Sequence, residues 1–179
     1  VAEAIRLMEE VVVLRPGDKT VAGVYATTLA WAADAQLRAC NLEDSRTLRN
    51  KVTELAEFSM LADPANNDLK KRYAFALTGL ARVQIVTGDL APAEKNLEKA
   101  ISILQQLLAA DPSNIHYSGR ALFRRVMLAE LLGETGQLES AKSMMQEIEL
   151  DFGPADDFAD QQGDYLDEYI DFLLAYANV

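Results

Sequence analysis

Apolar residues recur along this chain at helical spacing, in segments that are separated by turn-forming residues. Residues 65–87 follow the i, i+3, i+4, i+7 spacing of an amphipathic helix, with apolar side chains at Leu69, Tyr73, Leu77, Leu80 and Ala81. A second stripe follows at Leu97, Ala100, Ile101, Leu104, Leu107 and Leu108. The pattern therefore predicts a pair of helices between residue 65 and the Asp111-Pro112 dipeptide.

Turn-forming residues indicate where these two helices begin and end. Gly88 follows the first helix and suits the left-handed residue after a helix end. Pro92 falls in the first turn of the second helix, where its missing N–H costs little. Pro112 ends that helix because it restricts the residue before it, and Asp111 or Ser113 is expected to cap the next helix.

The helix pair recurs with a period of 48 residues. Residues of one type keep this spacing at Pro16, Pro64 and Pro112, at Ala33, Ala81 and Ala129, and at Leu42, Leu90 and Leu138. A fixed period of this length is typical of a protein built from stacked repeats. We therefore divide the chain into helix-pair repeats at 16–63, 64–111 and 112–154.

The two ends of the chain extend this pattern. Residues 1–15 correspond to the second helix of a repeat whose first helix is missing, which indicates a segment of a longer protein. Residues 155–179 include an amphipathic, acidic stretch at 164–177 that is expected to cap the stack. The predicted fold is an all-α superhelix of about eight antiparallel helices in a single domain, 1–179. The alternative is a globular helical bundle.

The recurring positions resemble the tetratricopeptide repeat (TPR) family. The second repeat carries the resemblance at Leu77, Leu80, Ala81, Gly88, Asp89, Ala93, Leu97 and Ala100, and the third at Leu128, Ala129, Gly136, Ala141 and Met145. The first repeat departs from the pattern at Cys40, Ser45 and Arg49. The family's unit has 34 residues, so each helix here is about two turns longer. The chain is similar to the long-unit variety found in multidomain bacterial signalling proteins.

The resemblance implies a right-handed stack whose first helices line a concave groove for a protein or peptide. Carried onto this chain, the groove residues are Thr27, Asp34, Arg38, Phe75, Thr78, Arg82, Val86, Phe123, Val126 and Glu130, with Ala30, Leu37, Ile85 and Glu134 beside them. Phe75 and Phe123 are candidate anchors for a partner, or they pack between helices. The Lys/Asn clamp with which some family members capture a C-terminal carboxylate is not reproduced at the equivalent positions, so such capture is not expected.

The resemblance favours a non-catalytic protein-interaction scaffold, the docking or sensing part of a larger regulatory protein. The alternative is a regulatory domain that binds a peptide or small anion near Arg72, Arg82, Arg120 and Arg124. Basic residues do cluster early in the equivalent first helices, at Lys70, Lys71, Arg72, Arg120, Arg124 and Arg125. Pairing of these cations with acids on adjacent helices, including Asp164, Asp167 and Asp171, is the competing explanation.

Charge limits the classes of partner. The net charge is −11, and residues 143–179 hold ten acids and no base. An acidic end repels phosphate backbones, so nucleic-acid binding is not expected. The acidic end is either a solvated face or a docking site for a basic partner. No apolar run is long enough to insert in a membrane. The oligomeric state and the compartment stay open, with the cytoplasm favoured.

Residues for chemistry are scarce. One histidine, His116, and one cysteine, Cys40, do not suffice for a zinc site. Asp156, Asp157 and Asp160 lack the alternation and terminal Glu of a calcium loop. The glycines are singletons at turns, so there is no phosphate-binding loop. We therefore expect no enzyme activity, no metal and no cofactor.

Overall fold

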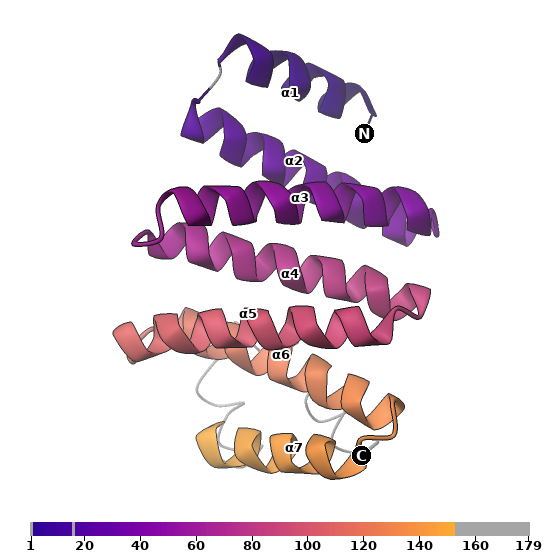
Figure 1. Ribbon diagram of the computed structural model, residues 1–179, viewed down its shortest axis with the longest axis vertical. Coiled ribbons are helices and arrows are strands. Elements are labelled where there is room, and N and C mark those ends of the chain that lie inside the picture. Colours follow the sequence, from indigo (N-terminus) through magenta and orange to yellow (C-terminus); the bar gives the residue numbers. More distant parts are fainter. Residues whose placement is uncertain (1, 16, 153–179) are drawn as a thin grey trace. The chain divides into compact units, whose positions relative to one another are not determined.

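The computed structural model describes residues 2–15 and 17–152 of the chain. Within these ranges it contains seven α-helices and no strand (Figure 1), which confirms the all-α prediction for this part. The helices are α1 (Ala2–Leu14), α2 (Lys19–Arg38), α3 (Leu42–Ala62), α4 (Asn67–Thr87), α5 (Leu90–Ala110), α6 (Ile115–Glu134) and α7 (Leu138–Phe152). The expected eighth helix at 164–177 and the cap at 155–179 lie outside the described residues.

The first helix of each predicted repeat begins at a capping residue, and these caps are 48 residues apart. Asp18, Asn66 and Asn114 precede α2, α4 and α6, and each side chain accepts hydrogen bonds from backbone N–H groups of the first turn. Such bonds satisfy donors that have no partner within the helix. The caps therefore explain why the period sets where these helices begin.

The cap of α6 corrects the expectation from the sequence. Asn114 is the N-cap, in place of Asp111 or Ser113. The Asp111 carboxylate instead accepts hydrogen bonds from Ser113 Oγ at 3.1 Å and Asn114 Nδ2 at 3.0 Å. The Asn114 N–H also donates to the Asp111 carbonyl at 3.1 Å, so Asp111 closes the turn and the helix begins three residues later.

The chain forms two compact units, Val1–Asp89 and Leu90–Val179, which meet within the predicted repeat 64–111. In the first unit, α1 to α4 lie side by side in chain order (Figure 1), and α2 also contacts α4. Its core contains Tyr25, Leu29, Val52 and Ala76, with Ile5, Met8, Val12, Ala30, Leu48, Leu55 and Ala56 packed around them. In the second unit, α5 packs against α6 and α6 against α7.

Small residues allow the helices of a repeat to approach closely. Ala33, Ala81 and Ala129 are fully buried, as are Ser45, Ala93 and Ala141. In the first repeat Ser45 Oγ donates a hydrogen bond to the Ala33 carbonyl at 2.9 Å, which joins α3 to α2. The periodic small residues thus lie where a larger side chain would separate the backbones.

A polar contact between helices also recurs with the period. Tyr25 Oη donates to Glu9 Oε1 at 2.9 Å, and Tyr73 Oη donates to Glu57 Oε1 at 2.5 Å. Both pairs span 16 residues and link the second helix of one repeat to the first helix of the next. Each tyrosine therefore buries its ring in the core and keeps a partner for its hydroxyl.

Candidate interaction surface

The outward sides of α2 and α4 form one surface of the first unit, which we name the α2/α4 face. It consists of Val24, Thr27, Trp31, Asp34 and Arg38 on α2 and, 48 residues later, Arg72, Phe75, Gly79, Arg82 and Val86 on α4. Within each helix these residues are spaced three or four apart, so they share one side. Because α2 and α4 are in contact, the two rows are neighbours.

Large apolar side chains are exposed on the α2/α4 face. Trp31 is 72% exposed and Phe75 is 39% exposed, and Val24 and Val86 are exposed as well. Single exposed apolar residues are common on protein surfaces, but a group on one face indicates an interaction site. Trp31 is the chain's one tryptophan, and the sequence interpretation missed it.

The exposed charges of the α2/α4 face are positive. Arg38, Arg72 and Arg82 are exposed. The one acid of the face, Asp34, forms an ion pair with Arg49 of α3. The face therefore carries cations that its own carboxylate does not neutralise.

Two helix-internal glycines make room for arginines on this face. A Cβ at Gly79 of α4 would lie 2.6 Å from Arg49 Cζ, so the Arg49 guanidinium lies directly on the helix backbone there. A Cβ at Gly23 of α2 would lie 2.6 Å from Arg72 NH1, so the Arg72 side chain crosses from α4 to α2. Glycine is unfavourable inside a helix, and at these two positions its lack of a side chain lets an arginine bridge neighbouring helices.

The structure places the predicted groove residues in different environments. Thr27, Arg38, Arg82, Val86 and Glu130 are exposed, and Asp34 and Phe123 are half-buried. Thr78 is 5% exposed, with its hydroxyl donating to the Ala74 carbonyl, and Val126 is 1% exposed, so neither presents a surface to a partner. The residues of α2 and α4 come together in the first unit, whereas Phe123, Val126 and Glu130 belong to the second.

Some members of the predicted basic cluster have acidic partners. Arg125 of α6 lies 2.5 Å from Asp151 and 3.6 Å from Glu147, both on α7. Lys71 lies 2.5 Å from Asp68, and this hydrogen bond, with a smaller contribution from Arg72, lowers the pKa of Asp68. Ion pairing therefore accounts for Lys71 and Arg125.

Arg124 is buried, and its NH1 donates to the Arg120 carbonyl at 2.7 Å. The acids Asp164, Asp167 and Asp171, which were expected to pair with this cluster, lie outside the described residues. The part of the expectation that concerns them stays a prediction.

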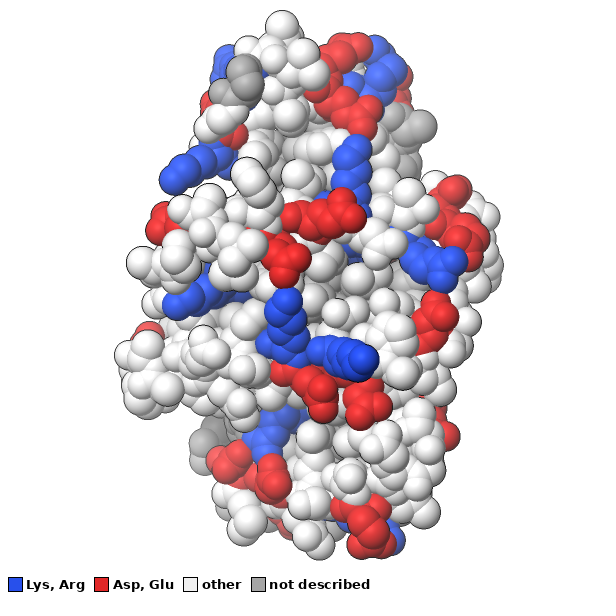
Figure 2. Space-filling view, in the orientation of Figure 1, with Lys and Arg blue, Asp and Glu red and all other residues white. Residues whose placement is uncertain are grey.

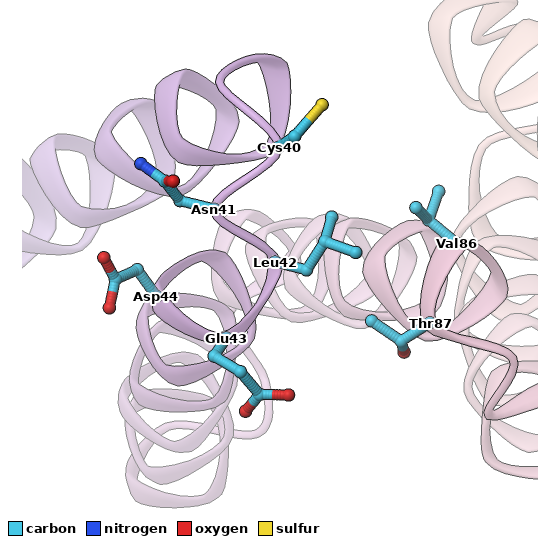
Figure 3. A pocket seen from close by; sticks show the side chains of 7 residues that line it. All are labelled: Cys40, Asn41, Leu42, Glu43, Asp44, Val86 and Thr87. Atoms are coloured by element: carbon cyan, nitrogen blue, oxygen red, sulfur yellow. The ribbon is translucent and has the colours of Figure 1, made fainter.

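A shallow hollow of about 670 Å³ lies beside the turn between α2 and α3 and the end of α4. Its lining residues are Cys40, Asn41, Leu42, Glu43, Asp44, Val86 and Thr87. In Figure 3, Leu42 extends toward Val86 across the hollow, while the Asn41 and Asp44 side chains point away from Val86. The polar groups do not converge, so this hollow has no arrangement typical of a catalytic site.

Metal ligands are not grouped in the part of the chain that the structure describes. No cluster of three or more His, Cys, Asp or Glu side chains lies there in a position to hold an ion. Likewise, none of the described helices combines the length and the apolar character that crossing a membrane requires. Figure 2 shows basic and acidic side chains interspersed on the face in view, in keeping with ion pairs such as Arg6–Glu10 and Arg46–Asp89.

No protein-family model, curated protein or solved structure matches this chain. The resemblance to tetratricopeptide repeats therefore rests on the residues alone, and a function has to be argued from the α2/α4 face.

Proposed function

We propose that this protein is a non-catalytic interaction module whose helix pairs stack as in the tetratricopeptide repeats. In this proposal it is the docking or sensing part of a larger regulatory protein. The 48-residue recurrence of caps, small buried residues and helix ends supports a single structural unit that has been copied. Stacked repeats present extended surfaces that commonly bind other proteins.

The exposure of Trp31 and Phe75 on the α2/α4 face carries this proposal. Tryptophan and other aromatic side chains contribute much of the binding energy at protein interfaces, because they bury a large area with few rotatable bonds. Trp31 lies beside exposed Val24 and Thr27 on the same side of α2. We propose that a partner's peptide segment lies along this face and covers both rings.

Selection from a phage-displayed library of random dodecapeptides tests the proposal. Peptides recovered on the wild-type protein are expected to lose binding when Trp31→Ala or Phe75→Ala is introduced. The loss should be at least about fivefold for each substitution, since truncation of a central aromatic typically costs more than 1 kcal/mol.

Phe58→Ala is the matched control for these variants. Phe58 lies on α3 and is 74% exposed, so its truncation removes a similar ring from outside the α2/α4 face. Peptides that bind all three variants equally well, or no recovery of specific peptides, would contradict the proposal.

A regulatory domain that binds a small anion is the second candidate function. The exposed cations Arg38 and Arg82 favour it. It predicts that inorganic phosphate or sulfate changes Trp31 emission in a saturable manner without any peptide, which a fluorescence titration would detect.

A further inference from the structure

Arg49 places a charge where the other repeats have an apolar side chain. The equivalent residues are Leu97 and Met145, which are 0% and 1% exposed, and Arg49 is itself 7% exposed. Burying a guanidinium is unfavourable unless its N–H groups find partners. Packing alone is better served by the Leu or Met of the other repeats, so Arg49 calls for a separate explanation.

The Arg49 guanidinium is only partly satisfied. Its NH2 donates to Asp34 Oδ1, and its Nε is buried with no hydrogen-bond partner among the described residues. NH1 lies against Gly79, and no hydrogen bond from it is recorded within the part of the chain that the structure describes. A guanidinium has five N–H donors, so Arg49 retains capacity to bind a further acceptor.

The guanidinium reaches the α2/α4 face at a defined place. It lies between Asp34 of α2 and Gly79 of α4, and Gly79 shares one side of its helix with exposed Arg82 and Val86. Glycine at 79 leaves this spot uncovered on the α4 side. The side chain therefore extends from α3, passes between two helices and ends at the surface proposed for a partner.

Neighbouring residues make this spot suitable for a carboxylate beside an apolar group. Trp31 and Arg38 are three and four residues from Asp34, and Arg82 is three residues from Gly79, spacings that make them neighbours on their helices. Three arginines, Arg38, Arg49 and Arg82, thus surround one acid, Asp34. The local excess of positive charge attracts an anion, and an arginine binds carboxylates with good geometry.

We infer that the α2/α4 face binds an acidic peptide segment, and that Arg49 is the residue that binds one of its Asp or Glu side chains. This inference rests on the proposed peptide-binding function and adds the chemical class of the partner. Asp34 holds the guanidinium in place, and Arg38 and Arg82 provide the surrounding positive charge. The chain's own net charge of −11 does not oppose this binding, because the attraction is local and is screened beyond about 10 Å.

The random dodecapeptide library also tests this inference. Peptides recovered on the wild-type protein are expected to be enriched in Asp and Glu over the starting library. The enrichment should disappear on Arg49→Leu and on Arg49→Met, which introduce the residues found at the equivalent positions 97 and 145. Two variants guard against misfolding of either one, and circular dichroism checks both. Lys95→Leu, which removes an exposed cation of the second unit, should retain the enrichment.

A recovered acidic peptide and its Gln/Asn analogue then measure the preference directly. The emission of Trp31, with calorimetry as a second readout, should show the acidic form binding at least about tenfold tighter to the wild-type protein, since a hydrogen bond to a charged group is being compared with one to a neutral group. Arg49→Leu should bind the two forms alike. Asp34→Asn should increase the preference, because it frees NH2 of Arg49 and removes the competing carboxylate.

The outcomes separate this inference from the function on which it rests. Peptides that depend on Trp31 but show no acidic preference overturn the inference and leave the interaction module standing. If no peptide depends on Trp31, the module and the inference both fail. An acidic preference that persists in both Arg49 variants shows that surface charge alone is responsible and overturns the role of Arg49. Enrichment only for peptides that carry a phosphate group would also overturn it.

Discussion

Cys40 and Gly88 occupy the same turn position 48 residues apart, and both have left-handed backbones, with φ of 59° and 80°. The hydrogen bonds around them are also the same. Cys40 N–H donates to Leu37 and Asn41 N–H to Gln36, while Gly88 N–H donates to Ile85 and Asp89 N–H to Gln84. Gly136 repeats the arrangement a third time, with φ of 81°. A residue with a Cβ therefore adopts, in one repeat, a conformation that favours glycine.

Cys40→Gly should stabilise the protein by about 0.5–1 kcal/mol. The left-handed conformation costs a residue with a Cβ about 1–2 kcal/mol, and the greater freedom of glycine in the unfolded chain offsets part of the gain. Urea denaturation measures the change. Gly88→Ala and Gly136→Ala are the matched controls and should have the opposite effect. A less stable Cys40→Gly protein would show that the thiol makes a contact worth more than the strain.

The contact among Glu9, Tyr25 and Lys51 should make stability depend on pH. Glu9 Oε1 accepts from Tyr25 Oη at 2.9 Å and from Lys51 Nζ at 3.0 Å, and Nζ lies 5.2 Å from the centre of the Tyr25 ring. Hydrogen bonds from Lys51 and then Tyr25 lower the pKa of Glu9. Hydrogen bonds to Tyr25 and then Glu9 raise the pKa of Lys51, and burial raises the pKa of Tyr25.

The signs of these shifts give the direction of each effect. A lowered pKa of Glu9 stabilises the fold above the ordinary range of a glutamate, and this contribution is lost as pH falls through the lowered value. Raised pKa values of Tyr25 and Lys51 stabilise the fold below about pH 10, and these contributions are lost as pH rises through the raised values. Tyr25→Phe should therefore flatten the alkaline decline in unfolding free energy. An identical decline in the two proteins would contradict this assignment.

The two halves of the Asp34–Arg49 pair should respond differently to substitution. Asp34→Ala leaves a buried guanidinium without its acid and should lower the unfolding free energy by about 1–3 kcal/mol, since the cost of an unpaired buried charge is reduced by the partial exposure of this site. Arg49→Leu leaves an acid whose side chain is 32% exposed and can be hydrated. It should change stability by no more than about 1 kcal/mol. If Arg49→Leu proves the more damaging of the two in urea denaturation, the pair contributes mainly through the packing of the arginine.

Gly79→Ala should reveal the contact between Gly79 and Arg49. Alanine inside a helix is favoured over glycine by about 1 kcal/mol, but here the new methyl group would displace the guanidinium from Asp34. We expect net destabilisation in the wild-type protein and a gain of about 1 kcal/mol in an Arg49→Ala background, a coupling that a double-mutant cycle measures.

Gly23→Ala is the matched control for Gly79→Ala. A Cβ at Gly23 meets the tip of Arg72, an exposed side chain that can move aside. This substitution should therefore be neutral or slightly stabilising. Equal effects of the two alanines would contradict the assignment of Arg49 as a fixed side chain.

The sequence predicted the helices well because their ends depend on local groups. Gly88 was expected to be left-handed, and its φ of 80° confirms this. The cap of α6 was wrong because three candidates, Asp111, Ser113 and Asn114, stand together and their own hydrogen bonds select among them. The eighth helix at 164–177 stays a prediction.

The interaction surface was harder to predict. The turn register placed Thr27, Asp34 and Arg38 on one side of their helix, and the structure agrees with that placement. Trp31 was missed, although it has the same register, because its equivalent in the next repeat is Gly79 and the pair shares no residue type. A helical projection of residues 24–38 would have found it.

Helix content, the 48-residue period and the capping positions follow from the amino-acid sequence, because each depends on groups a few residues apart. The exposure of Trp31 and the burial of Thr78 follow from which sides of α2 and α4 meet their neighbours. The position of the Arg49 guanidinium against Asp34 and Gly79 depends on three helices at once. No local pattern encodes it, because its energy comes from contacts between residues 15 and 30 positions apart that exist only when those helices are packed.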